Sequence, residues 1–309
     1  MFISKFKQWL DDNDPYGLQR ITFHKALFVA TIATYVYWIF RPVGTQTFFP
    51  AFFALSFYES PALVTFAEKE RLLIFMAVAL IGISVSFYLV YPFKGTFFFF
   101  SVLVLAITYF MVLKYFYALK NLTMLLLVNG AVILSTQPQG SLQVAYNFTS
   151  AIVLAMATAF ISLKIFPNRY LFVWNKAMQK FIFCLEEGID YAIQQKRASI
   201  ADELIHIGMV RNFRRLVPHK YLMSTYRFSI NLRRIEHCLD SLYYETMNET
   251  FWHFVKENLE SIRLKMNDYT PCGSPNMPIQ PETKLQHYIM NCLQQVFLQW
   301  NKLCYLQQR

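Results

Sequence analysis

The stretch FFALSFYESPALVTFAEKERLLIFMAVALI, residues 52–81, contains two apolar segments with a charged segment between them. The charged residues run from Glu59 to Arg71, in a region that otherwise avoids charge. Two apolar segments joined in this way are found in a soluble helical hairpin and also where a chain leaves a membrane and re-enters it. The sequence on either side decides between these alternatives.

Charge is distributed unevenly along the chain. Residues 21–163 hold ten charged side chains, whereas residues 164–309 hold 32. The chain as a whole is 55% hydrophobic and 16% charged, against roughly 25% charged in an average soluble domain. A shift of this kind indicates two different solvents. We therefore predict an all-α membrane protein, with a transmembrane domain at 21–166 and a cytoplasmic helical domain at 167–309.

Six apolar segments in the first half are long enough to cross a hydrocarbon core, which takes roughly 20 helical residues. The predicted spans are 21–40, 43–58, 71–92, 96–113, 120–136 and 144–166. The turn-forming cluster STQPQGSLQ (135–143) separates the last two. Six consecutive helices without a polar face are not expected in a soluble bundle.

Lys and Arg residues near the span ends predict the orientation. Twelve of them fall on one side of the predicted membrane and two, Arg41 and Lys94, on the other. Both termini are therefore predicted to be cytoplasmic, and positions near Thr45 and Gln139 should face outward. The stretch from Glu59 to Arg71 then becomes a cytoplasmic crossing. All five cysteines follow residue 180, which agrees with a reducing compartment.

The regions on either side of the predicted spans are also expected to be helical. Residues 1–20 lack a cleavable signal pattern and predict an amphipathic segment that lies in the membrane interface. Four apolar stripes at helical spacing predict the core of a bundle in the cytoplasmic domain, with part of one stripe open to contact with a partner subunit. The stripes run from Leu171 to Ala192, Phe228 to Leu242, Phe251 to Met266 and Leu285 to Leu303, with a Pro/Gly-rich linker at 268–281 before the last.

No sequence pattern predicts an enzyme, a cofactor or a metal site. The nine glycines are scattered and form no phosphate-binding loop. Neither HCLD (237–240) nor HIGMVRNFRRLVPH (206–219) places two metal ligands on one helix face at i and i+4, and no nucleophile elbow is present. We therefore expect no catalytic residues and no nucleotide-driven transport.

A run of cations without an intervening acid lies in the cytoplasmic half. It consists of Arg211, Arg214, Arg215, Lys220, Arg227, Arg233 and Arg234. One interpretation is a helix face that is solvated or lies against anionic lipid headgroups. The other is a surface that concentrates organic anions at the cytoplasmic mouth of a pore. Nucleic acid is not expected as a partner beside a membrane.

Polar side chains at membrane depth are candidates for a substrate path, because burying them without a partner is costly. The candidates are Lys25, Glu59, Arg71 and Asn129. Hydroxyl side chains can instead bond to their own helix backbone. We expect this of Thr31, Thr34, Ser84 and Ser86.

The layout resembles one half of the fusaric acid resistance family, which includes the aromatic carboxylic acid exporters of bacterial inner membranes. RITFHKALFVATIATYV (20–36) opens the first span, ESPALVTFAEKERLL (59–73) leads into the third, and KIFPNRY (164–170) leaves the sixth. A more distant similarity is to the aluminium-activated malate transporters of plants. The resemblance covers roughly residues 15–195. The Gly-rich third span of the family is represented here by Gly82 alone.

This resemblance implies an inner-membrane secondary exporter or channel for organic, aromatic carboxylic acids. It implies lipid and an organic anion as partners, and it leaves room for a periplasmic adaptor protein. Because the family supplies two such halves, it also implies a homodimer, with the stripe from Leu171 to Ala192 as the expected contact. The alternative is a membrane-anchored scaffold or regulator whose helical tail binds partners.

Overall fold

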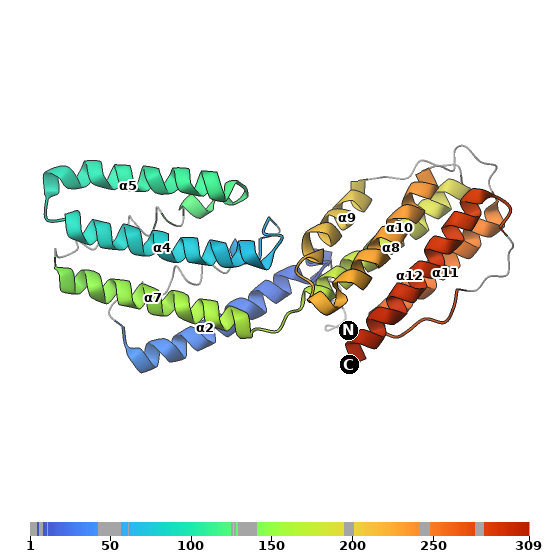
Figure 1. Ribbon diagram of the computed structural model, residues 1–309, viewed down its shortest axis with the longest axis horizontal. Coiled ribbons are helices and arrows are strands. Elements are labelled where there is room, and N and C mark those ends of the chain that lie inside the picture. Colours follow the sequence, from blue (N-terminus) through green and yellow to red (C-terminus); the bar gives the residue numbers. More distant parts are fainter. Residues whose placement is uncertain are drawn as a thin grey trace. The chain divides into compact units, whose positions relative to one another are not determined.

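The computed structural model describes residues 12–42, 57–60, 62–124, 141–194, 201–240, 248–275 and 281–308, together with positions 5, 9, 10, 126 and 128. Within these residues the chain is all-α, with nine α-helices and one 3-10 helix. The chain divides into two compact units (Figure 1). One comprises residues 19–167, here called the apolar unit. The other comprises residues 168–309 together with residues 1–18, here called the tail unit.

The apolar unit contains four helices that are long and apolar enough to cross a membrane. They are α2 (Leu18–Phe40), α4 (Phe66–Val90), α5 (Lys94–Tyr115) and α7 (Leu142–Ile165), with the 3-10 helix η2 (Tyr117–Leu119) after α5. They correspond to the predicted first, third, fourth and sixth spans. The predicted second and fifth spans lie largely outside the described residues. The described part of the chain thus has four candidate membrane spans, which suggest a multi-pass membrane protein, where the sequence predicted six.

Helix α4 packs against α5 and α7, and Figure 1 shows it between them. Its inner face repeats large apolar side chains at helical spacing, and Leu72, Met76, Leu80 and Phe87 have no exposed surface. The facing side of α7 is rich in small residues such as Ala155, so that the two backbones can approach closely. The outer faces remain apolar, as expected for helices that contact lipid.

The tail unit is a bundle of five helices, all of which Figure 1 labels. They are α8 (Tyr170–Ile193), α9 (Ala201–Arg214), α10 (His219–Asp240), α11 (Glu249–Asp268) and α12 (Lys284–Gln308). Helix α8 contacts α9, α10 and α11, while α12 contacts α10 and α11. These contacts make α8 to α12 one helical bundle.

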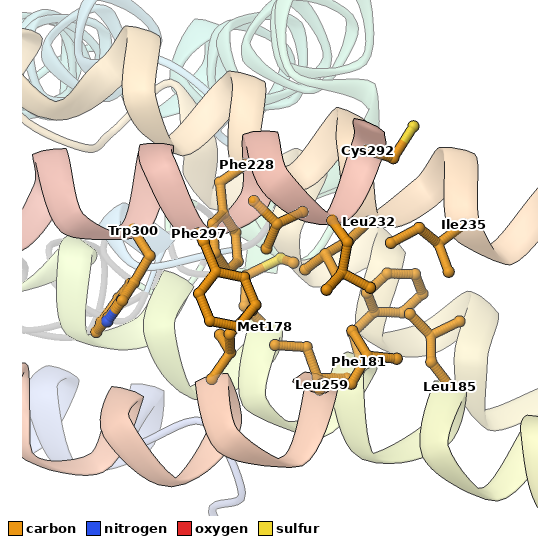
Figure 2. Packing of buried hydrophobic residues seen from close by; sticks show 14 of the residues in the cluster. Met178, Phe181, Leu185, Phe228, Leu232, Ile235, Leu259, Cys292, Phe297 and Trp300 are labelled. Atoms are coloured by element: carbon orange, nitrogen blue, oxygen red, sulfur yellow. The ribbon is translucent and has the colours of Figure 1, made fainter. Parts of the chain in front are cut away.

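The four predicted stripes form the core of this bundle. Figure 2 shows Phe181 and Leu185 of α8 pointing towards side chains of α10, α11 and α12. The predicted stripe residue Leu242 lies outside the described residues. One prediction from the stripes is wrong: the stripe from Leu171 to Ala192 is not a contact between subunits. Its central side chains, including Trp174 and Met178, are buried within the bundle of their own chain.

Residues near the N-terminus group with the tail unit, where the sequence predicted a separate interfacial segment. Asp14 is buried, and the Tyr16 hydroxyl lies 2.6 Å from Nδ1 of His206 in α9. Gly17 has a φ of 72°, and a Cβ at this position would lie 2.8 Å from the ring of Phe172. Glycine therefore suits this turn both for its backbone conformation and for the close approach of α8.

Two ion pairs join α8 to α11. Arg263 Nε donates to both oxygens of Glu186, at 2.8 and 3.1 Å, and Lys256 Nζ donates to both oxygens of Asp190, at 2.7 Å. The Glu186 carboxylate is 6% exposed. Burial raises the pKa of Glu186, and the Arg263 guanidinium acts against this shift.

Replacing Arg263 by Met should destabilise the tail unit by about 2 kcal/mol at neutral pH. This is less than for a fully buried pair, because Arg263 is partly exposed. A carboxyl whose pKa is raised in the folded state favours folding below its unfolded pKa and loses this contribution as the pH rises through its folded pKa. The defect should therefore shrink on acidification. Urea unfolding at about pH 5 and about pH 8, followed by tryptophan fluorescence, checks this.

The matched control for this measurement is the double variant Arg263→Met/Glu186→Gln, which removes the carboxylate as well. Gln at position 186 does not titrate, so the pH dependence of stability that residue 186 causes in this range should disappear. An Arg263→Met defect of equal size at both pH values would contradict the assignment of the pair.

Candidate functional site

Helix α4 begins at Phe66, because a capping box fixes its first turn. The hydroxyl of Thr65 accepts a hydrogen bond from the N–H of Glu68 at 3.2 Å. In return, Glu68 Oε2 accepts the N–H groups of Thr65 and Val64 at 3.0 and 2.9 Å. The helix thus starts five residues earlier than the predicted span start at residue 71.

This early start sets the register of the charged residues on α4. Lys69 falls on the same face as Leu72 and Met76, and it has no exposed surface. Arg71 falls on the outer face with Ile74 and is exposed. Two residues along a helix correspond to a rotation of about 200°, so the two cations point in nearly opposite directions.

Lys69 shares the carboxylate of Glu59 with Lys25, and Glu59 and Lys25 are both predicted site residues. Lys25 Nζ of α2 donates to Glu59 Oε1 at 2.6 Å, and Lys69 Nζ donates to Glu59 Oε2 at 3.3 Å. All three side chains are at most 6% exposed. One carboxylate therefore bridges two buried ammonium groups near the N-terminal ends of α2 and α4. We call this the Lys25–Glu59–Lys69 cluster.

Aromatic rings lie against the cations of this cluster. The ring of Tyr58 is 5.7 Å from Lys25 Nζ and 4.7 Å from Lys69 Nζ, measured to its centroid. The ring of Phe166, which directly follows α7, is 5.6 Å from Lys25 Nζ. Phe166 is held in turn by an edge-to-face contact with Phe28 of α2, at 5.6 Å. Rings at such distances stabilise a desolvated cation by roughly 0.5–2 kcal/mol.

The cluster has more positive than negative groups. The sequence of residues 19–167 contains three carboxylates, Glu59, Glu68 and Glu70. Glu68 caps α4, and Glu70 lies 3.2 Å from Lys164 Nζ in an exposed pair. Glu59 is thus the acid that serves both buried lysines. Burying an excess charge costs several kcal/mol, which an added carboxylate would offset.

The predicted site residues separate into three groups. Lys25 and Glu59 come together as part of one cluster, whereas Arg71 is not among the groups around Glu59. Asn129 lies outside the described residues. Lys69 was missed, although extending the apolar stripe of Leu72 and Met76 back by one turn would have found it.

Most hydroxyl groups of the apolar unit bond to their own helix, as predicted. Thr31, Thr34 and Ser86 donate to the carbonyls four residues earlier, at 2.8, 2.8 and 2.6 Å. Ser84 of α4 departs from this prediction, and Ser162 of α7 behaves likewise: both hydroxyls are buried without a hydrogen-bond partner. Within the described part of the chain, no group of three His, Cys, Asp or Glu side chains could hold a metal ion.

The predicted basic run lies on α9, on α10 and in the turn between them, which contains Arg215. Arg211 and Arg214 occupy the last turn of α9, where cations interact favourably with the helix dipole. Arg214 is half-buried, with its guanidinium 4.5 Å from the ring centroid of Tyr226 on α10. The other cations of the run are exposed.

Comparison with known proteins identifies no relative of this chain. No protein-family model matches it, and neither the curated proteins nor the solved structures provide a match. An inference about function therefore has to rest on the residues and on their geometry.

Proposed function

We propose that this protein is an inner-membrane carrier or channel for organic carboxylic acids, and that the Lys25–Glu59–Lys69 cluster binds the substrate carboxylate. One observation carries the proposal: a carboxylate is held between two buried ammonium groups in a helical unit otherwise built of apolar side chains. Glu59 occupies the position that a substrate carboxylate would take. A substrate that pairs with one lysine would leave Glu59 paired with the other.

The surroundings of the cluster favour an aromatic acid as the substrate. The rings of Tyr58 and Phe166 lie against the ammonium groups. A substrate ring beside them would gain edge-to-face contacts of about 0.5–1.5 kcal/mol. This agrees with the resemblance of the layout to the fusaric acid resistance family, which we retain as part of the proposal.

The proposal includes the architecture that such transport requires. It has six spans with both termini in the cytoplasm, and two or more copies of the chain form the complete transporter. The Lys25–Glu59–Lys69 cluster then lies at the cytoplasmic ends of the first and third spans. A periplasmic adaptor could join the assembly. Because the sequence contains no nucleotide-binding loop, the proton gradient or a substrate gradient would drive movement.

Uptake of labelled benzoate into liposomes that contain the purified protein tests the proposal. Lys25→Gln and Lys69→Gln should each lower uptake by about 10- to 100-fold, the equivalent of one hydrogen bond to a charged group. Lys114→Gln, at an exposed position on α5, is the matched control and should retain wild-type uptake.

Arg71→Gln distinguishes the sequence-based interpretation from the structural one. The sequence placed Arg71 in the substrate path, so its replacement should abolish uptake. Its exposed position on α4 instead predicts uptake close to wild type. Full benzoate uptake by both cluster variants would show that the cluster is not the binding point.

A membrane-anchored scaffold is the second candidate, and one observation favours it. The tail unit has its own extensive core, separate from that of the apolar unit, as a partner-binding domain would need. Wild-type liposomes that move no aromatic acid under any imposed gradient would favour this candidate over the carrier.

A further inference from the structure

We infer that the exposed face of α10 is a docking surface for anionic lipid headgroups. This inference does not depend on the proposed transport function. Lys220, Arg227 and Arg234 follow one another at seven-residue spacing and are all exposed. At 3.6 residues per turn they lie within roughly 40° of each other around the helix. They form a line of cations along one edge of the exposed face.

Apolar side chains occupy the middle of the same face. Met223 is 58% exposed and Tyr226 is 40% exposed. Arg233, also exposed, lies on the edge opposite to the line of three cations. The exposed face spans roughly 140° of the helix. An apolar centre with cations on both edges is the arrangement of a helix that lies in a membrane interface, with its charged heads reaching the lipid phosphates.

Charge complementarity and tethering identify the partner. The sequence from 204 to 235 contains no acidic residue, so no acid lies between Lys220 and Arg234 on α10. The next acid, Glu236, lies 4.0 Å from Arg233 and offsets the charge of that cation. Residues 166–169 alone separate α7, a candidate span, from α8 of the tail unit. A surface tethered in this way meets anionic headgroups at a high effective concentration. Each Lys or Arg near such a surface strengthens binding by roughly five-fold.

A fluorescent label at position 223 tests this in the full chain. Cys184 is partly exposed and the other four cysteines are buried, so Met223→Cys is made in a Cys184→Ser background and labelled with a polarity-sensitive fluorophore. The protein is placed in nanodiscs of phosphatidylcholine alone or mixed with phosphatidylglycerol. Leu264→Cys on α11, which is also exposed, provides the reference label. The environment of the label at position 223 should become less polar in the anionic discs only, and salt at about 1 M should reverse this change.

Two triple variants decide whether the cations of α10 are responsible. Lys220→Gln/Arg227→Gln/Arg234→Gln should weaken docking by roughly 100-fold and return the label to an aqueous signal. Lys265→Gln/Lys284→Gln/Lys302→Gln removes the same charge from exposed positions elsewhere in the tail unit and should leave the signal unchanged. The inference is overturned if the label at position 223 reports an aqueous environment in both kinds of disc. It is also overturned if the two triple variants lose the response to anionic lipid equally. If the label at position 223 reports a less polar environment only when an oligonucleotide is added, the inference is overturned in favour of nucleic acid.

Discussion

Replacing Glu59 by Gln is expected to destabilise the apolar unit by about 3–5 kcal/mol, because it leaves two buried ammonium groups without the carboxylate that bridges them. The two lysines would also repel each other across the neutral amide. The purified protein is heated in detergent and then passed over a size-exclusion column. The monodisperse peak of the variant should disappear at a clearly lower temperature than that of the wild type. The tail unit provides an internal reference, since it contains four buried cysteines whose protection from thiol reagents should be unchanged.

The control for Glu59 replaces the whole cluster. In the triple variant Lys25→Met/Glu59→Gln/Lys69→Met no charge is buried, and most of the lost stability should return, because replacing a complete buried ion network by apolar groups is often nearly neutral. This variant should still fail to take up benzoate, which separates folding from binding. If Glu59→Gln alone is as stable as the wild type, the cluster does not hold α2 and α4 together.

Replacing Trp300 by Ala is expected to cost the tail unit about 3–5 kcal/mol, the usual range for removing a large buried aromatic side chain. Trp300 is 1% exposed, and its indole N–H donates to the carbonyl of Thr270 at 2.9 Å. Its ring lies 6.1 Å from those of Phe228 and Tyr269, measured between centroids. The variant therefore loses a core side chain of α12 and the bond that holds the segment after α11.

Thiol labelling in increasing urea measures this loss. Burial raises the pKa of Cys272 and of Cys304 to about 11, so these thiols stay protonated and unreactive while the tail unit is folded. In Trp300→Ala they should react at a markedly lower urea concentration than in the wild type. Trp300→Phe keeps most of the ring volume and loses the hydrogen bond, so a cost of about 1–3 kcal/mol is expected. Equal urea midpoints of thiol labelling for Trp300→Ala and the wild type would contradict the role of Trp300 in the core.

The candidate site could be predicted from the sequence in part. Lys25 and Glu59 stand out because they are ionisable groups in an apolar region, which is a local property of the chain. Their mutual contact spans 34 residues, and no pattern within either segment specifies it. Lys69 was missed because the predicted span began at residue 71, although the capping box of Thr65 and Glu68 was visible in the sequence. A shift in the helix start does not change hydropathy, but it decides which cation belongs to the buried face.

The sequence by itself determined the division into an apolar and a charged half, the long apolar segments of the first half and the core stripes of the tail. These follow from hydropathy and from repeats of three and four residues, which depend only on near neighbours along the chain. The tertiary structure alone decided that residues 1–18 join the tail unit, where Tyr16 meets His206 across 190 positions. It alone decided that the stripe on α8 is covered by its own chain rather than by a partner, and that one carboxylate bridges Lys25 and Lys69. Such pairings depend on which of many compatible faces meet in space, and that choice is made by the packing of the whole unit.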